Sequence, residues 1–233
     1  MDWRESKMSK ISCIICAFNE EPRINTVLSA INGHPLIDEV IVIDDGSTDG
    51  TDNVVRKHEW AKLIVHEKNM GKSQAMCTGI LAAQNSQIMF LDADLIGITK
   101  ENITSLAMPV VEGKSDITIS LRQNSLWIYR FIGLDFVSGE RVMDRKYIME
   151  NMEEIKKLPG YGIEVFMNRL MINHKLRISI VDWNNVRLAT KQQKLGFWKG
   201  TVGEIKMLRQ IMKVVSLKEV FYQNYKLLKL RVR

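Results

Sequence analysis

Hydrophobic and polar positions alternate along the first half of the chain in two patterns. Short, nearly continuous apolar runs predict buried strands over 10–18, 39–43, 61–67, 87–91 and 116–120. Between them, apolar residues three and four positions apart predict helices after Asn19, near Asn53, over 69–84 and over about 101–112. Asn19 is the expected cap of the first helix. Strands that alternate with helices in this way predict an α/β fold with a mostly parallel sheet flanked by helices.

The pattern becomes less regular after residue 121. We expect a loop over 122–140, helices over about 142–157 and 161–174, and a last strand over 177–183. Apolar residues return at helical spacing from about 202 onward. The chain therefore indicates one α/β domain with a helical C-terminal extension.

Composition and cysteine content narrow the class of protein. The 233 residues are 45% hydrophobic and 26% charged, which is typical of a globular domain. No apolar run approaches the ~18 residues needed to cross a bilayer, and residues 1–10 lack the apolar core of a signal peptide. Cys13 and Cys16 lie on one predicted strand, so their side chains should point to opposite faces as small core residues. A cytoplasmic location is expected.

Positive charge is concentrated at the C-terminal end. Residues 199–233 hold nine of the 33 Lys and Arg residues and two of the 27 Asp and Glu residues, which leaves 24 against 25 elsewhere. A basic helical tail can adsorb to an anionic membrane surface, which would make the protein peripheral at the inner face of the cell membrane. The alternative is a helix that packs on the domain with a solvated basic face. No nucleic-acid-binding motif accompanies the charge, so nucleic acid is not an expected partner.

Acidic residues follow three of the predicted strands. Glu20 comes after the first strand, Asp44 and Asp45 after the second, and Asp92 and Asp94 after the fourth. Ligands of open parallel sheets bind at the carboxyl ends of the strands, so these acids should gather at one edge. Each motif alone is an ordinary turn. Together they predict a site where Mg²⁺ or Mn²⁺, held by the Asp92 and Asp94 carboxylates, is completed by phosphates of a bound ligand.

Four ordered segments carry a family resemblance. CIICAFNEE, VIVIDDGSTDGT, KNMGKSQAM and IMFLDADL resemble the successive signatures of family 2 glycosyltransferases of the GT-A fold, over roughly residues 10–120. The resemblance implies a nucleotide-sugar site formed by Ala17, Phe18, Glu20, Asp44, Asp45, Lys72, Asp92, Ala93 and Asp94. Asp44 would pair with the base, Lys72 would lie near the base or the phosphates, and Asp94 would ligate the metal. Cys16 departs from the family, which usually has proline there.

The resemblance also implies a division of the chain. Residues 1–9 would be a tail and 10–198 a GT-A domain, with a nucleotide-sugar half over 10–120 and an acceptor half over 121–198. Residues 199–233 would form the basic helical segment. A UDP-sugar is favoured over a GDP-sugar by analogy alone.

The acceptor half contains two further segments of this kind. FVSGERVMDRKYI resembles the SGxR segment of polyprenyl-phosphate sugar transferases, which would place Glu140 and Arg141 at the reaction centre and let Gly139 allow a close backbone approach. GYGIEVFMN resembles a GYGxE helix start, which would make Glu164 an acceptor-site acid. An alternative for Glu164 is simple stabilisation of a helix N-terminus.

The acceptor decides which catalytic groups are required. Transfer to a saccharide hydroxyl needs a general base, for which Glu164, Glu140 and Asp135 are the candidates in that order. A polyprenyl phosphate acceptor is already anionic and needs only a cation such as Arg141 or Arg145.

Departures from the family limit the prediction. Related enzymes often carry a histidine in the segment that corresponds to 182–196, and this chain has Leu188 or its neighbours there and no histidine. The segment KQQKLGFW lacks the arginine of the Q-x-x-R-W motif, so neither chain elongation nor a retaining transfer of the phosphoglycerate type is expected. We predict a metal-dependent, inverting glycosyltransferase. The alternative is a catalytically degenerate GT-A domain that acts as a membrane- or partner-binding module.

Overall fold

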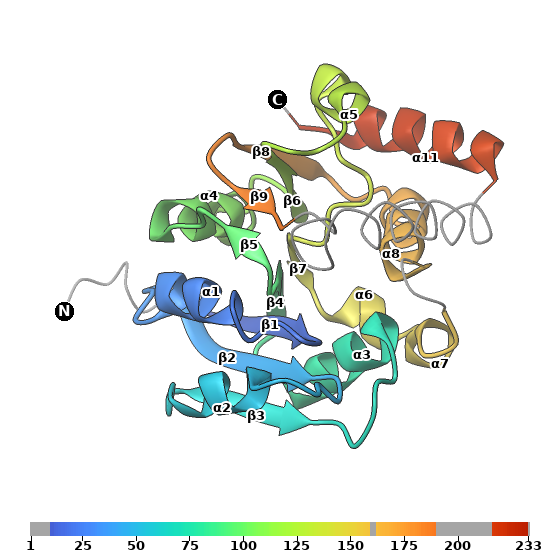
Figure 1. Cartoon of the computed structure of the whole chain (residues 1–233). Helices are drawn as coiled ribbons and strands as arrows, with labels where there is room; N and C mark the ends of the chain where they lie inside the picture. Colours follow the sequence, from blue (N-terminus) through green and yellow to red (C-terminus); the bar gives the residue numbers. More distant parts are fainter. Residues whose placement is uncertain (1–9, 159–161, 190–215, 233) are drawn as a thin grey trace.

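A single seven-stranded sheet forms the centre of the computed structural model, which describes residues 10–158, 162–189 and 216–232 (Figure 1). Its strand order is β3-β2-β1-β4-β7-β6-β8. The strands are β1 (Ile11–Ala17), β2 (Ile37–Asp44), β3 (Ala61–Val65), β4 (Gln87–Asp92), β6 (Ile117–Arg122), β7 (Arg141–Asp144) and β8 (Ile178–Trp183). All neighbouring pairs are parallel except those of β7, which runs antiparallel to both β4 and β6. The predicted mostly parallel sheet is confirmed.

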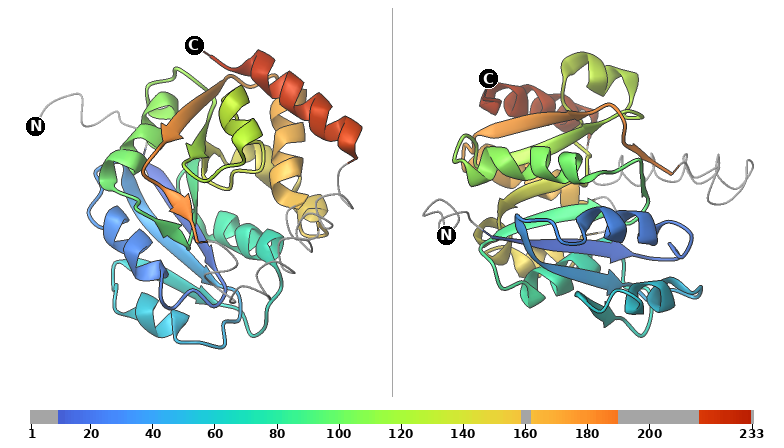
Figure 2. Two further views of the ribbon diagram at one scale, coloured as in Figure 1. Left: turned by 45° about the horizontal axis from the view of Figure 1, so that its top comes forward. Right: turned by 90° about the vertical axis from the view of Figure 1, so that its left-hand side faces the viewer.

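Helices cover both faces of this sheet (Figure 2). One face packs against α1 (Ile24–Ile31), α2 (Thr51–Arg56) and α4 (Lys100–Val111). The opposite face packs against α3 (Lys72–Ala82), α6 (Lys146–Met149), α7 (Met152–Ile155) and α8 (Gly162–Asn173). Each face has its own apolar core, because successive strand residues point to opposite sides. The sheet therefore lies between two helical layers.

The two cysteines of β1 follow this alternation. Cys13 is buried in the core on the α1 side, and Cys16 packs against the core on the α3 side. Burial raises the pKa of both thiols, so they stay protonated. The prediction that they are core residues on opposite faces is confirmed.

Three local predictions are wrong. Asn19 does not cap α1, whose cap is Arg23; Asn19 instead adopts a left-handed turn with φ 56° and accepts a hydrogen bond from Thr48 N. The expected loop over 122–140 contains a short helix, α5 (Trp127–Ile132). The expected helix over 142–157 begins with strand β7, because this segment completes the sheet between β4 and β6 before α6 and α7 follow.

The remaining elements are a small second sheet and the C-terminal helix. β5 (Leu95–Ile96) pairs with β9 (Arg187–Leu188) in a separate two-stranded sheet. The C-terminal helix α11 (Leu217–Leu230) packs on α8, and Val232 N donates to Ile178 O at the edge of β8. Within the described residues, no helix combines the length and apolarity that a membrane span requires. The predicted tail over 1–9 and the segment KQQKLGFW lie outside the described residues.

Strand register sets the position of the predicted site. Ala17 on β1 is level with Asp44 on β2, and Cys16 is level with Asp92 on β4. The carboxyl ends of three adjacent parallel strands therefore meet at one edge of the sheet, as expected of a ligand site in an open α/β sheet.

Candidate active site

A cavity of about 400 Å³ opens at this edge of the sheet. It is lined by Cys16, Ala17, Phe18, Glu20, Asp45, Asn69, Gly71, Lys72, Ala75, Asp92, Ala93, Asp94 and Leu188. The structure thus brings together every predicted nucleotide-sugar residue except Asp44, which is buried at the end of β2 and accepts a hydrogen bond from Ser47 N at 2.9 Å. A larger hollow of about 1000 Å³ lies between α4, β8 and the end of α11, and none of its described lining residues is acidic.

The loops after β1 and β2 hold each other in place beside the cavity. Asn19 N donates to Ser47 Oγ at 2.9 Å, and Glu20 N donates to Thr51 Oγ1 at 2.9 Å. The Glu20 carboxylate is paired with Arg23. The hydroxyl-rich segment after Asp45 therefore acts by fixing the wall formed by Ala17 to Glu20, with its hydroxyls bonded to backbone amides.

Asp45 fixes the segment that leads into α3. Its carboxylate accepts hydrogen bonds from Met70 N at 2.9 Å and from Gly71 N at 2.8 Å, and His66 Nδ1 lies 2.8 Å from Oδ1. The segment also approaches Gly46, where φ is +72° and an added Cβ would lie 2.4 Å from the Lys68 carbonyl carbon. Asp45 therefore places the first turn of α3, and with it Lys72, at the cavity.

Lys72 is the central cation of the site. Its Nζ lies 3.0 Å from Asp92 Oδ1 and 2.8 Å from Glu164 Oε1. Burial lowers the pKa of Lys72, but the charges of Asp92 and Glu164 raise it more, so the pKa lies well above its usual value. Lys72 is therefore a permanent positive charge between a strand end and a helix start.

The same balance keeps Asp92 ionised. Burial raises the pKa of this carboxyl, while Lys72 and Arg122 lower it by a larger amount. Asp92 Oδ2 lies 3.9 Å from Arg122 Nη1. The crowding of Asp92 and Asp94 that the sequence suggested is thus relieved in part by two protein cations. Sequence reasoning missed Arg122, whose only signal is a basic residue at the end of an apolar strand.

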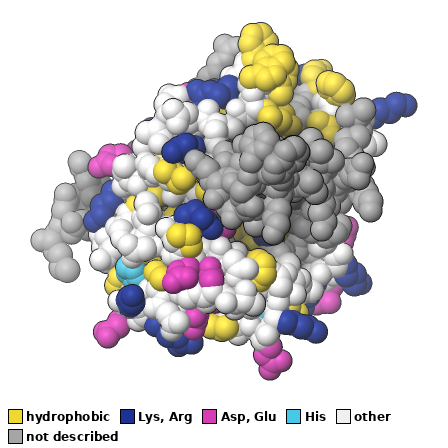
Figure 3. Space-filling model, viewed as in Figure 1, with side chains coloured by type: hydrophobic (Ala, Val, Ile, Leu, Met, Phe, Trp, Pro, Cys, Tyr) yellow, Lys and Arg dark blue, Asp and Glu magenta, His cyan; other side chains and the backbone are white. Residues whose placement is uncertain are grey.

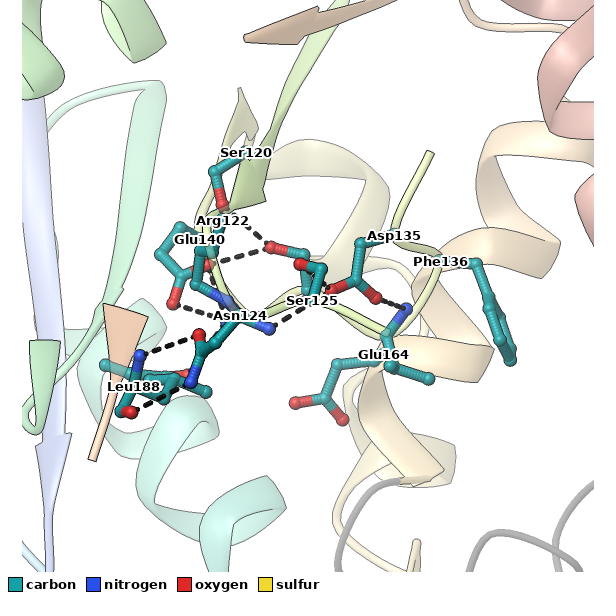
Figure 4. Close-up of polar contacts among 12 residues, drawn as sticks. Ser120, Arg122, Asn124, Ser125, Asp135, Phe136, Glu140, Glu164 and Leu188 are labelled. Atoms are coloured by element: carbon teal, nitrogen blue, oxygen red, sulfur yellow. Dashed lines mark hydrogen bonds and ion pairs between the residues drawn. The ribbon is translucent and has the colours of Figure 1, made fainter. Parts of the chain in front are cut away.

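Arg122 organises a buried network beside the cavity (Figure 4). Its Nη1 lies 2.8 Å from both carboxylate oxygens of Glu140, and its Nη2 lies 3.2 Å from Asp135 Oδ2. Ser120 and Ser138 also donate to Glu140 Oε2, at 2.7 and 2.8 Å. Burial lowers the pKa of Arg122, but its acidic partners raise it more. Glu140 and Asp135 are both buried and already bound, so they position Arg122 and are poorly placed to act as bases.

Arg141, the first residue of β7, binds the loop that precedes this strand. It is fully buried and donates to Ser138 O at 2.8 Å, Phe136 O at 2.9 Å and Asn168 Oδ1 at 2.9 Å. Burial lowers the pKa of this guanidinium to about 10. Arg141 therefore holds backbone carbonyls of the loop. Arg145, the other predicted cation, donates to Ala83 O.

Gly139 lets this loop approach the strand end. An added Cβ at Gly139 would lie 2.8 Å from Asp92 Oδ2 and 2.9 Å from Asp92 Oδ1. The predicted close approach is therefore present, and it is made to the Asp92 carboxylate.

Glu164 lies in the first turn of α8 and faces the same region (Figure 4). Its side chain is 1% exposed, and Oε1 is paired with Lys72. Within the described residues, Oε2 has no hydrogen-bond partner. A buried carboxylate oxygen without a partner is costly, which is typical of a group that meets a ligand. Among the three base candidates, Glu164 alone keeps an oxygen that no described residue bonds.

The acids fit a cation that a ligand helps to hold. Asp94 lines the cavity next to Asp92, and its backbone carbonyl accepts from Ala189 N at 3.1 Å. No three His, Cys, Asp or Glu side chains converge among the described residues. Mg²⁺ and Mn²⁺ suit such a site, because one or two carboxylates and the phosphates of a ligand are a common ligand set for them.

Leu188, which lies in the segment where related enzymes often carry a histidine, was assigned no role at the site by sequence reasoning. It reaches the cavity on β9, where the Asn124 side chain donates to Leu188 O at 3.0 Å and accepts from Leu188 N at 3.1 Å (Figure 4). The Asn124 side chain thus bonds both backbone groups of Leu188, as the backbone of a paired strand would. This pairing joins the segment after β6 to the cavity wall.

Comparison with known proteins gives a consistent result. A sequence model of glycosyl transferase family 2 matches residues 12–172. The chain is 24% identical over 233 residues to glycosyltransferase GlyA of Streptococcus pneumoniae, covering 96% of this chain and 31% of that protein. It is 25% identical over 231 residues to cholesterol galactosyltransferase of Borreliella burgdorferi, covering 93% of this chain and 60% of that protein.

A shorter match links the chain to dodecaprenyl-phosphate galacturonate synthase of Rhizobium johnstonii, with 30% identity over 124 residues, 49% of this chain and 36% of that protein. The chain thus spans between 31% and 60% of the length of these curated relatives. Among solved structures, glucosyl-3-phosphoglycerate synthase of Mycobacterium tuberculosis, in complex with Mn²⁺, UDP and phosphoglyceric acid, is similar with a TM-score of 0.70 and 21% identity. This likeness covers 91% of this chain and 80% of that chain, and it confirms the predicted GT-A fold.

Proposed function

Because the chain belongs to glycosyl transferase family 2, we propose that it transfers a sugar from a nucleoside-diphosphate sugar, a UDP-sugar first, to an acceptor hydroxyl. The observation that carries the proposal is the joint position of Lys72, Asp92 and Asp94 at one cavity on the strand ends. The solved relative with UDP and Mn²⁺ supports the choice of base and cation.

The donor diphosphate would be held by charge. Asp92 and Asp94 would hold Mg²⁺ or Mn²⁺, and the permanent positive charge of Lys72 would lie beside the phosphates. A bound cation of this kind supplies Lewis-acid stabilisation of the negative charge that develops on the leaving diphosphate. Lys72 would add to this stabilisation from a fixed position, because Asp92 and Glu164 orient its ammonium.

The acceptor side favours a hydroxyl over a phosphate. A hydroxyl must lose a proton as it attacks, and Glu164 Oε2, which no described residue bonds, can accept that proton. The cations expected to receive a phosphate acceptor are engaged elsewhere, Arg141 by three polar groups of the loop and α8, and Arg145 by Ala83 O. A single base that takes the proton of the attacking hydroxyl is what direct displacement with inversion requires. A saccharide or a lipid with a free hydroxyl is therefore the proposed acceptor class.

Calorimetry tests the donor site directly. UDP, GDP, UDP-glucose and GDP-mannose are titrated into the wild type, Asp94→Ala and the surface control Asp52→Ala, each with and without Mn²⁺. We expect metal-dependent binding of the uridine ligands that is lost in Asp94→Ala and kept in Asp52→Ala. Absence of binding for every nucleotide would contradict the proposal and favour a catalytically degenerate domain that binds a membrane or a partner.

A further inference from the structure

Helix α5 and the C-terminal helix α11 lie side by side at one end of the molecule. α5 and α11 are neighbours at the top of Figure 1 and stay together in both views of Figure 2. Arg231, just after α11, donates to Gly133 O, just after α5, at 3.4 Å. These helices therefore form one continuous surface.

α5 exposes large apolar side chains on this surface. Trp127 is 77% exposed and Phe131 is 84% exposed, and Leu126 and Ile128 beside them are also exposed. Trp127 and Phe131 are four positions apart, so they lie on the same face of the helix. Figure 3 shows hydrophobic side chains gathered over this end of the molecule. Scattered single exposed residues are normal, but an exposed cluster of this kind marks an interaction site.

α11 extends the surface with aromatic and basic side chains. It buries Gln223 and Leu227 against the domain and exposes Phe221, Tyr222 and Tyr225. Lysines stand between these rings: Lys226 Nζ lies 5.5 Å from the centre of the Tyr222 ring, and Lys229 Nζ lies 4.6 Å from that of Tyr225. The described residues 216–232 carry four Lys and Arg side chains and one acid, Glu219, which is paired with Arg169 at 2.7 Å.

We infer that this aromatic–basic surface, formed by Trp127 and Phe131 on α5 and by the aromatic residues and lysines of α11, binds an anionic lipid bilayer. Aromatic rings favour the level of the lipid headgroups, and interleaved lysines meet the negative surface charge. The inference deepens the proposed function and rests on it, because it selects a membrane lipid with a free hydroxyl as the acceptor class.

The residue composition of this surface favours a lipid bilayer over a protein partner or a second copy of the chain. Lysine is depleted at protein–protein interfaces, whereas here Lys218 and Lys229 are exposed on α11, and Lys226 and Lys229 lie beside its rings. A symmetric pair of chains joined at this surface would place two lysine-bearing patches against each other, which like-charge repulsion disfavours. An anionic membrane accommodates the aromatic rings at the level of the headgroups and attracts the lysines by its negative surface charge.

The surface is joined to the site by direct contacts. In the sequence, α5 lies between Arg122 and Asp135. These two side chains are bonded to each other in the buried network. Arg130 of α5 donates to Arg122 O at 2.9 Å. On the other helix, Gln223 Oε1 accepts from Asn168 Nδ2 at 3.2 Å, and Asn168 in turn binds Arg141. A bilayer bound at this surface would thus lie against the segments that hold the acceptor side of the cavity.

Vesicle sedimentation tests the inference with the full chain. The vesicles contain phosphatidylcholine alone or phosphatidylcholine mixed with phosphatidylglycerol. The variants are Trp127→Ser with Phe131→Ser, and Lys218→Gln with Lys226→Gln and Lys229→Gln. Trp60→Ser with Leu81→Ser is the control, because these exposed apolar residues lie outside the surface. Calorimetric UDP binding is measured on every variant to establish that it is folded and that its donor site is intact.

We expect the wild type and the control to bind the anionic vesicles, with an affinity that falls as salt is added. The aromatic variant should bind about tenfold more weakly or worse, and the lysine variant should lose about fivefold for each lysine. Wild-type protein that ignores both kinds of vesicle while binding UDP would overturn the inference and leave the proposed function standing. Variants that bind vesicles as the wild type does, or a dimer that these substitutions dissolve in sedimentation velocity, would also overturn it.

Discussion

Lys72 Nζ lies 2.8 Å from Glu164 Oε1, and this ion pair joins the two halves of the protein. Lys72 begins α3 in the half that holds the nucleotide-sugar motifs, and Glu164 lies in the first turn of α8 in the other half. The same ammonium also binds Asp92. One cation therefore contacts both a carboxylate at a strand end and the candidate base on α8.

Replacing Lys72 should destabilise the fold. Lys72→Met leaves the carboxylates of Asp92 and Glu164 without their shared cation, at a cost of about 3 kcal/mol in the free energy of unfolding. Urea unfolding at neutral pH measures the change. Lys62→Met on the exposed face of the edge strand β3 is the matched control and should shift the free energy by less than about 0.5 kcal/mol. Equal effects of the two substitutions would show that the Lys72 pairs carry no net stability.

Glu164 is expected to act in the chemical step. Glu164→Gln keeps the shape of the side chain but removes the group that accepts the acceptor's proton, so kcat should fall by roughly 10²–10⁴. Calorimetric binding of UDP should stay at the wild-type value. Glu154→Gln on the exposed side of α7 serves as the control. A Glu164→Gln enzyme with wild-type kcat would assign Glu164 to holding Lys72 alone.

The lowered pKa of Asp92 makes stability depend on pH. The folded-state pKa lies below the ordinary value of 3.8, because Lys72 and Arg122 outweigh the effect of burial. The stabilisation from this carboxylate is therefore present above pH 3.8 and is lost as the pH falls through the folded-state pKa. Urea unfolding from about pH 6 to about pH 3 should show the wild type approaching Asp92→Asn in stability.

Glu59→Gln, which removes an exposed carboxyl, is the control substitution and is measured over the same pH range. A difference between the wild type and Asp92→Asn that stays constant down to the lowest pH would contradict the assigned direction of the pKa shift.

The contact between Gly139 and Asp92 can be tested by a double-mutant cycle. The Cβ of Gly139→Ala would overlap the Asp92 carboxylate and force it away from Lys72, which should cost about 1–3 kcal/mol. In an Asp92→Ala background the same change should cost much less, because the carboxylate is gone. Urea unfolding of the four proteins gives the coupling energy. An unchanged cost in that background would place the strain elsewhere.

The positions of the site acids could be predicted because they depend on local patterns. Apolar runs and helical spacing located the strands, and the polar residues that end them fall at one edge of any parallel sheet. Asp45, Asp92 and Asp94 therefore line the cavity as expected. The same reasoning did not predict β7, a short strand that forms by pairing with β4 on one side and with β6 on the other.

The class of fold, the strand ends and the family could all be predicted from the residues alone, since they rest on short-range periodicity and on motifs within single loops. The pairing of charged side chains could be seen only in the folded structure. Lys72 binds Glu164, and Arg122 takes up Glu140 and Asp135, which removes two of the three base candidates. Such pairs form between segments far apart in the chain, where packing of the helices and the cost of burying an unpaired charge select the partners.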